Sequence, residues 1–375
     1  MAVEESPIKL RRGRFLRLAI INGLLFAALL GACEIALRGL GWRPPTNYSN
    51  VRYENDPITG PWFLPSQSGF IQGVCFRNDD IHVNSFGMRD RERTLGAGGP
   101  RVALVGDSML QGLQVRDDQV VSRKLEQLSG GRAEMLNFGV SSVGTSVELL
   151  NYRRRVRPFH PDTVLLLFAL SNDVIDNLPA LKMRLDPGMG AISPYLLLDD
   201  QGKLKDEPQP GLPYRTSRLL GWASTSVIGQ WLHYTYQEMR RARIRKAAPA
   251  APATSGEEAF REQAWQITEQ VLLKFHDQVA RDGAHFGLVI IPPSMGDIGQ
   301  TGAVGADGQA AIRRLQAVAA RGGFPALDLS APFAARVQQS GPTAFSYPCD
   351  GHWNPEGHAI AAQAMFQFLK EQRWL

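Results

Sequence analysis

Five short apolar runs, separated by segments with helical periodicity, constrain the fold of this chain most strongly. Each run ends close to a glycine or a polar residue, as buried parallel strands often do. The predicted strands are residues 101–106, 133–139, 163–170, 286–292 and 325–329. Helices are predicted near 110–125 and over 146–157, 257–282, 307–321 and 355–369. This alternation predicts an α/β fold with a parallel five-stranded sheet between two layers of helices.

Two long segments do not fit the alternation. Residues 177–256, between the third and fourth strands, hold a loop-rich stretch, a helix over about 225–246 and a Pro/Ala linker at 247–254. We expect this insertion to form a lid or a substrate wall above the sheet. Residues 43–100 are predicted to be an extended lead-in to the main domain of residues 101–375. It is expected to pack on that domain through Trp62, Phe63, Phe70 and Phe86.

The N-terminus looks like a membrane-targeting segment. Residues 1–17 are basic, and the stretch from Leu18 to Cys33 is uncharged. A spanning helix needs about 20 mostly apolar residues, which requires the segment to continue through Glu34 to Leu37. The basic flank predicts a cytoplasmic N-terminus and an exported remainder. We expect a single-pass signal anchor at 18–37 in a bacterial inner membrane, with the catalytic domain periplasmic or extracellular.

Two other interpretations of this segment stay open. Leu30-Gly31-Ala32-Cys33 resembles a lipobox, in which the cysteine is lipidated after cleavage, and ordinary signal cleavage is the third option. All three place the bulk of the chain outside the cytoplasm.

The charge is concentrated at the N-terminus. The net charge is +5, and within residues 1–17 five basic residues outnumber two acidic ones by three, leaving a surplus of about two elsewhere. This balance argues against a nucleic-acid partner.

Polar residues and glycines follow each of the first three predicted strands. Gly106-Asp107-Ser108, Gly139 and Ser171-Asn172-Asp173 occupy these positions, and Asp350-Gly351-His352 precedes the last helix. Open parallel sheets bind ligands at the carboxyl ends of their strands, so we expect these groups to converge.

The convergence would assemble a serine nucleophile. A serine hydroxyl needs a base, and His352 can act as one for Ser108, with Asp350 orienting the imidazole. Attack on an ester creates an oxyanion, for which we expect three donors: the backbone N–H groups of Ser108 and Gly139, and the side-chain amide of Asn172. The N–H of Ser108 would lie at a helix N-terminus, where the helix dipole adds support.

These motifs resemble the blocks of the SGNH (GDSL-type) hydrolases. Gly106-Asp107-Ser108-Met109 matches the Gly-Asp-Ser-Leu block with Met for Leu, and Gly139 corresponds to the second block. Ser171-Asn172-Asp173 matches the third without its glycine, and Asp350-Gly351-His352 matches the closing block. The resemblance implies a three-layer, flavodoxin-like α/β/α fold and chemistry on O-acyl groups, with no cofactor or metal.

The spacing of the closing block leaves the reaction open. Many family hydrolases have two residues between Asp and His, whereas one residue separates Asp350 from His352. That spacing resembles the branch of alginate acetyltransferase-like proteins that acetylate exopolysaccharides. We therefore expect a serine esterase acting on O-acyl groups, foremost acetyl, of an envelope or extracellular carbohydrate or lipid. A polysaccharide O-acyltransferase with the same triad is the alternative, and a non-catalytic glycan-binding envelope protein is the third hypothesis.

The three cysteines add one structural hypothesis. Cys33, Cys75 and Cys349 lack C-x-x-C zinc spacing, and we predict no metal site. In an oxidising compartment Cys75 and Cys349 can pair, which would tie the lead-in to the loop that carries Asp350 and His352.

Overall fold

The computed structural model describes residues 7–42, 48–96, 99–185, 190, 192–215, 225–247, 256–292, 304–341 and 344–375. The chain forms two compact units. One unit comprises residues 1–46 and 222–249, and the other comprises 47–221 and 250–375. Most of the predicted Pro/Ala linker (247–254) lies outside the described residues.

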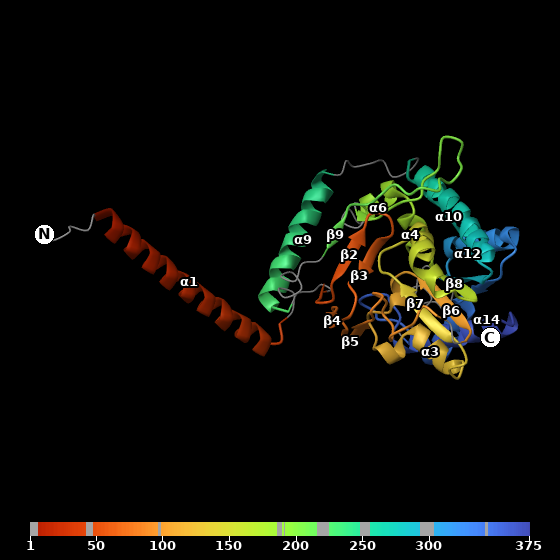
Figure 1. Cartoon of the computed structure of the whole chain (residues 1–375), viewed down its shortest axis with the longest axis horizontal. Coiled ribbons are helices and arrows are strands. Elements are labelled where there is room, and N and C mark those ends of the chain that lie inside the picture. The colour runs from red at the N-terminus through yellow and green to blue at the C-terminus, as the bar shows by residue number, and fades with distance from the viewer. Residues whose placement is uncertain are drawn as a thin grey trace. The chain divides into compact units, whose positions relative to one another are not determined.

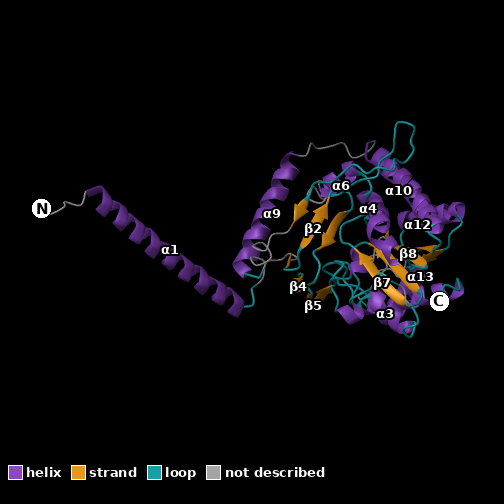
Figure 2. Cartoon of the chain, in the orientation of Figure 1, coloured by secondary structure: helices purple, strands orange, loops and turns teal. Residues whose placement is uncertain are grey.

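A five-stranded parallel sheet organises the larger unit (Figures 1 and 2). The strand order is β11-β10-β8-β6-β7, which in chain order along the sheet is the 2-1-3-4-5 arrangement of flavodoxin-like folds. The predicted α/β class and five-stranded parallel sheet are thus confirmed. The strands are β6 (Arg101–Gly106), β7 (Glu134–Gly139), β8 (Thr163–Ala169), β10 (His285–Ile291) and β11 (Ala326–Asp328).

Each face of this sheet is covered by helices. Alternate residues of β6 point to opposite faces, so Ala103 and Val105 join one core cluster and Val102 and Leu104 the other. The first cluster includes side chains of α4 (Thr145–Asn151), α10 (Gly256–Arg281) and α12 (Ala306–Gly322). The second includes side chains of α3 (Val121–Leu128), α13 (Ser330–Ser340) and α14 (Pro355–Glu371).

The first two predicted helices are interrupted. The segment after β6 forms α2 (Ser108–Gln111), a 3-10 turn at Asp117–Gln119 and then α3, because Gly112 ends α2 in the left-handed region at φ 62°. The helix predicted at 146–157 passes from α4 into a π-helical turn (Tyr152–Val156) and a 3-10 turn (Arg157–Phe159). Helix α13 was not predicted.

The segment expected to be an extended lead-in forms two small antiparallel sheets instead. One has the order β1-β4-β5 and the other β3-β2-β9. Strand β9 comes from the insertion, so residues far apart in sequence share a sheet. The bounds are β1 (Tyr48–Ser49), β2 (Tyr53–Asp56), β3 (Gly60–Phe63), β4 (Gln67–Gln72), β5 (Arg77–Val83) and β9 (Tyr214–Arg215).

The four aromatic residues of the lead-in differ in how deeply they pack. Trp62 is buried in the first core cluster, and Phe86 packs against that cluster from a partly buried position. Phe63 instead packs on a small cluster formed by Val51, Ile81 and Val83. Phe70 makes an edge contact with Tyr48.

The remaining described helices of the larger unit belong to the insertion or adjoin it. They are α5 (Asp173–Asp176) and α6 (Pro179–Leu185). In the smaller unit, α1 (Pro7–Gly39) and α9 (Val227–Ala247) contact each other. Residues 14–39 of α1 are long and apolar enough to cross a membrane.

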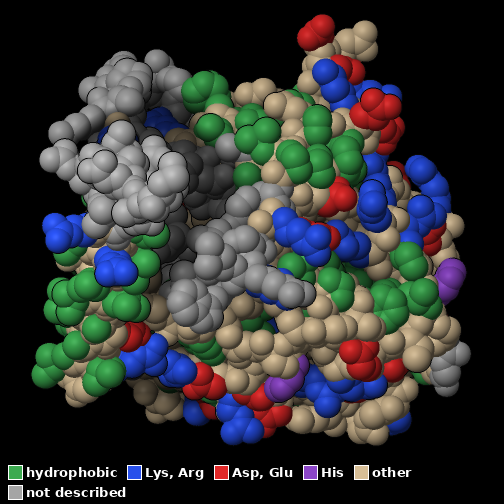
Figure 3. All heavy atoms as spheres, turned by 60° about the vertical axis from the view of Figure 1, so that its left-hand side comes forward, with side chains coloured by type: hydrophobic (Ala, Val, Ile, Leu, Met, Phe, Trp, Pro, Cys, Tyr) green, Lys and Arg blue, Asp and Glu red, His purple; other side chains and the backbone are tan. Residues whose placement is uncertain are grey.

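Charged side chains of both signs are intermixed on the face drawn in Figure 3. The basic residues at 153–157, on and after the π-helical turn, also have partners that offset their charge. Arg154 and Arg157 pair with Asp56 and Asp282, and the Arg155 guanidinium lies 4.5 Å from the Trp62 ring centroid. This run is therefore engaged inside the larger unit.

Candidate active site

Ser108 follows β6 directly and begins α2. The Asp107 carboxylate caps this one-turn helix by accepting a hydrogen bond from the Met109 N–H at 2.9 Å. The helix is only four residues long, so its dipole adds less at Ser108 than the predicted longer helix would. The strand and the cap together fix where the Ser108 hydroxyl lies.

The structure brings Ser108, His352 and Asp350 together. The Ser108 Oγ lies 2.8 Å from His352 Nε2, and His352 Nδ1 lies 2.9 Å from Asp350 Oδ2. The serine comes from the carboxyl end of β6 and the other two residues from the loop before α14, as the sequence predicts. The three side chains, which occur in the order Ser, Asp, His along the chain, therefore form one continuous hydrogen-bonded row with His352 in the middle.

The Asp350–His352 loop is braced from both sides. The N–H of Tyr347 donates to the His352 carbonyl at 2.8 Å, and Gly351 adopts the left-handed region at φ 76°, where glycine is unstrained. A disulfide joins Cys75 and Cys349, whose Cα atoms are 6.0 Å apart. These contacts tie the loop to the segment between β4 and β5.

The environment of His352 favours its protonated form. Burial lowers its pKa, but the hydrogen bond and the charge of Asp350 outweigh burial and raise the pKa above the ordinary histidine value. The imidazole side chain is 24% exposed and that of Asp350 is 11% exposed. The carboxylate therefore stabilises a positive charge on the imidazole.

Gln114 is a site residue that the sequence did not reveal. Its Nε2 donates to Asp350 Oδ2 at 2.9 Å, the same oxygen that faces His352. A lone glutamine in a loop after α2 carries no motif, so only the fold places it there. It orients the carboxylate that orients the imidazole.

Two of the predicted oxyanion donors, Asn172 and Gly139, have different hydrogen-bond partners in the structure. The Asn172 Oδ1 accepts the Ser171 hydroxyl at 2.8 Å, and its amide nitrogen donates to Asp173 Oδ1 at 3.4 Å. The N–H of Gly139, by contrast, donates to Asn137 Oδ1 at 2.9 Å. A side-chain carbon on Gly139 would lie 2.4 Å from the Gln111 nitrogen, so the glycine serves close packing against α2. The Gly139 N–H, which we expected to donate to an oxyanion, therefore already has a partner in this structure.

Ser142 stands at a position that sequence reasoning missed. It lies three residues beyond the end of β7 with φ 63°, a conformation uncommon for residues other than glycine. Within the part of the chain that the structure describes, its N–H donates no hydrogen bond. A glycine there would have signalled this turn from the sequence, whereas serine does not.

A buried group of carboxylates lies behind Ser108 and Asn172. Asp107, Glu148 and Asp173 are almost fully buried, and burial raises the pKa of each. The Asp173 Oδ2 accepts the Ala169 N–H at 2.7 Å, which braces the Asn172 loop. Asp176 pairs with Lys182 at 2.7 Å. These contacts are structural supports for the site.

The segment Asn84–Asp90 also supports the site. The buried Arg89 guanidinium donates to the carbonyl groups of Gln111, Gly112 and Val115, just past α2. It also pairs with Asp117 at 3.0 Å. The segment therefore fixes the far end of the helix that begins at Ser108.

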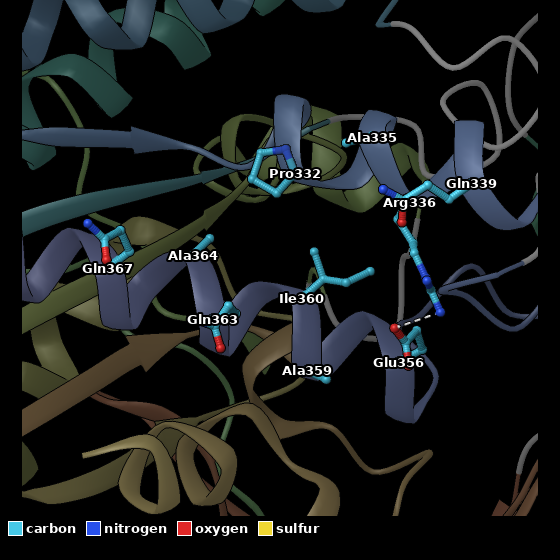
Figure 4. A pocket seen from close by; sticks show the side chains of 10 residues that line it. All are labelled: Pro332, Ala335, Arg336, Gln339, Glu356, Ala359, Ile360, Gln363, Ala364 and Gln367. Atoms are coloured by element: carbon cyan, nitrogen blue, oxygen red, sulfur yellow. Dashed lines mark ion pairs between the residues drawn. The ribbon is translucent and has the colours of Figure 1, made fainter.

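Two other places in the larger unit are separate from the triad. A groove of about 560 Å³ lies between α13 and α14 and includes the Arg336–Glu356 ion pair, but none of the triad residues (Figure 4).

The second place is a cluster of three side chains that could bind a metal ion. Ligand atoms of Asp80, His82 and Asp117 lie within 4.8 Å of one another. Asp117 there is already paired with Arg89 and His82.

A family comparison decides the classification. The family model described as "GDSL-like Lipase/Acylhydrolase family" matches residues 104–360, from within β6 into α14. The chain belongs to the GDSL-like lipase/acylhydrolase family. Membership makes it an ester-hydrolase type of enzyme, and the matched range contains Ser108, Asp350 and His352.

Two solved structures show what the chain is similar to. One is LAE5, an α/β hydrolase enzyme from the metagenome of Lake Arreo, Spain, with 14% identity and a TM-score of 0.42; the match covers 76% of this chain and 99% of LAE5. Another is a lipase/acylhydrolase from Enterococcus faecalis, with 12% identity, a TM-score of 0.39 and coverage of 73% and 96%. A comparison with curated protein sequences found no match.

Proposed function

We propose that this GDSL-like enzyme is an exported, membrane-anchored serine esterase that works through an acyl-enzyme at Ser108. The observation that carries the proposal is the 2.8 Å contact between Ser108 Oγ and His352 Nε2, continued at 2.9 Å from His352 Nδ1 to Asp350 Oδ2. A serine nucleophile requires this relay of hydroxyl, base and orienting carboxylate.

The proposed reaction has two steps. His352 Nε2 takes the hydroxyl proton while Ser108 Oγ attacks the acyl carbonyl, and the tetrahedral intermediate collapses when the imidazolium returns that proton to the leaving alkoxide. Water then attacks the acyl-serine, again with His352 as the base, and the carboxylic acid leaves. Asp350 stays ionised throughout and stabilises the imidazolium.

The oxyanion site in this proposal has three donors. They are the N–H of Ser108, the side-chain amide of Asn172 and the N–H of Ser142, which replaces Gly139 in that role. Two observations support the exchange: the Gly139 N–H is already bonded to Asn137, and the N–H of the left-handed Ser142 donates no hydrogen bond among the described residues. Losing one such donor typically costs about 3–4 kcal/mol in the transition state.

The proposed substrate is an O-acyl ester, foremost an acetyl ester, of an envelope or extracellular carbohydrate or lipid. Transfer to a polysaccharide hydroxyl is the second candidate, since the single residue between Asp350 and His352 resembles the exopolysaccharide-acetylating branch. A sugar hydroxyl would then replace water in the second step.

The proposed location follows from α1. Residues 14–39 form a 26-residue apolar helix near the N-terminus, preceded by a basic segment. This pattern supports a single-pass signal anchor in a bacterial inner membrane, with the catalytic unit on the periplasmic or extracellular side. A disulfide between Cys75 and Cys349 would be stable in such an oxidising compartment.

The test is hydrolysis of p-nitrophenyl acetate by the full chain, with and without an oligosaccharide acceptor. Ser108→Ala should abolish turnover, whereas Ser68→Ala, an exposed serine on β4, should leave it unchanged. Equal activity of both variants would reject the mechanism. Acetyl groups on the acceptor would assign transfer, and release of acetate alone would assign hydrolysis.

A further inference from the structure

Helix α9 presents an exposed apolar face. Trp231, Leu232, Tyr236 and Met239 are exposed, with exposed fractions between 45% and 59%. Leu232, Tyr236 and Met239 are four and three residues apart and therefore lie on one side of the helix. Trp231 is adjacent to Leu232 in sequence and flanks that side, and we call the four side chains together the α9 stripe. Val227 and Gln230, by contrast, are buried. Several exposed apolar side chains gathered on one helix indicate a surface that meets something other than water.

The N-terminus of α9 is bound to the last turns of α1. The Glu34 carboxylate accepts hydrogen bonds from the N–H groups of Val227 and Ile228, at 2.9 and 3.0 Å, and from the Ser226 hydroxyl at 3.0 Å. Arg38 donates to the same carboxylate at 2.7 Å. A second nitrogen of the Arg38 guanidinium, Nη2, donates to the Thr225 carbonyl at 2.7 Å. The start of α9 therefore stays beside residues 34–38 of α1.

The length of the uncharged part of α1 places this junction at a membrane boundary. At about 1.5 Å per residue, the stretch between Arg17 and Glu34 is about 24 Å long, shorter than the roughly 30 Å hydrocarbon layer. Arg17 can extend its long side chain to the headgroups. Glu34 has a short side chain, so it needs local partners for its charge. Arg38 and the N-terminus of α9 are those partners.

The composition of α9 is typical of helices that lie at the boundary between the hydrocarbon layer and the lipid headgroups. Trp and Tyr concentrate where hydrocarbon meets headgroups, and both occur in the α9 stripe. The C-terminal part of the helix carries five basic residues within seven positions, Arg240, Arg241, Arg243, Arg245 and Lys246. Clusters of four to eight basic residues bind anionic lipid headgroups.

We propose that α9 is an interfacial helix, which lies along the bilayer surface on the side where α1 ends, with the α9 stripe in the acyl–headgroup boundary and its basic end on anionic phospholipid. The inference rests on the proposed anchoring by α1 and is independent of the catalytic mechanism. The occupant of the stripe is lipid, because the stripe begins at the helix that would enter the membrane.

The experiment measures where spin labels lie in the full-length protein reconstituted in phosphatidylcholine vesicles containing phosphatidylglycerol. Single cysteines for labelling are introduced in a Cys33→Ser background. Leu232→Cys reports on the α9 stripe, Leu25→Cys on α1, and Leu128→Cys, an exposed leucine on α3, is the matched control. Collisions with oxygen report lipid, and collisions with a water-soluble nickel complex report water.

We expect the label at 232 to collide more with oxygen than with nickel, at a depth shallower than the label at 25. The label at 128 should collide mainly with nickel. If the label at 232 behaves like the one at 128 while that at 25 is in lipid, the inference is overturned and the anchor stands. Protection of 232 from both reagents would also overturn it, in favour of a protein partner or a second copy. A water-exposed label at 25 would refute the anchor itself.

A separate measurement tests whether the basic C-terminal end of α9 binds anionic lipid. A label introduced by Met239→Cys should shift toward nickel accessibility when phosphatidylglycerol is omitted, because the anionic headgroups would no longer hold that end. No shift would overturn the assignment of the basic end to anionic phospholipid. None of these measurements depends on ester hydrolysis, so they stand apart from the test of the proposed reaction.

Discussion

Arg89 offers the sharpest test of how the scaffold supports the nucleophile. Its guanidinium is 1% exposed and holds three carbonyl groups beyond α2 together with Asp117. Arg89→Met keeps an unbranched, largely apolar side chain but removes the charge and every donor. A buried acceptor left without its donor costs about 1–3 kcal/mol, so the loss of the donor to three carbonyl groups should lower the free energy of unfolding by at least about 3 kcal/mol.

The matched control is two residues away. Arg91 is 44% exposed and pairs with Glu126 and Glu134. Exposed pairs contribute about 0–1 kcal/mol, so Arg91→Met should lower the free energy of unfolding by no more than that. The assay is urea unfolding of the full chain in detergent micelles, followed by tryptophan fluorescence.

The same variants separate stability from positioning. Under conditions where both remain folded, Arg89→Met should lose on the order of a hundredfold in kcat/KM, because a displacement of about 1 Å at α2 misplaces Ser108. Arg91→Met should keep its activity. If the two variants unfold at the same urea concentration and hydrolyse the ester equally well, Arg89 does not support the site.

Three further predictions concern His352, His358 and the Cys75–Cys349 bond. Because the pKa of His352 is raised, the acid limb of the plot of kcat/KM against pH should lie above pH 6.5. Asp350→Asn removes the charge that raises this pKa and should move the acid limb to lower pH. An acid limb that does not move would contradict this assignment. Burial lowers the pKa of His358 to about 3, so the unfolded state alone takes up a proton below about pH 6.5. Stability should therefore fall by about 2 kcal/mol between pH 7 and pH 5, and a His358→Asn variant with the same pH slope in urea unfolding would refute that origin. Non-reducing peptide mass spectrometry should find Cys75 linked to Cys349, and reduction should lower the free energy of unfolding by about 2–4 kcal/mol; two free thiols would exclude the bond.

Much of the fold follows from the sequence because its strands are short, apolar and separated by helices. The predicted strands at 101–106 and 163–170 match β6 and β8 to within one residue. Their carboxyl ends then place Ser108 and Asn172 at one edge of the sheet. The order of the strands within this sheet, by contrast, came from the structure.

Other features depend on contacts that no local pattern encodes. Strands β2 and β4 are rich in polar residues and pair within small sheets, so neither shows the alternation that predicts a strand. Gly139 follows β7 as expected, but its N–H is bonded to Asn137, two residues earlier. Gln114 reaches Asp350 across 236 positions of sequence. Such roles arise only once the chain is folded.

The central proposal is that the hydroxyl of Ser108 is the nucleophile activated by His352. The most direct measurement is peptide mass spectrometry of the full chain after reaction with a fluorophosphonate, which transfers its phosphonyl group to an activated serine and releases fluoride. We predict one adduct, on Ser108, and its loss in His352→Ala. An adduct on another residue, or unchanged labelling of Ser108 without the imidazole, would contradict the proposal.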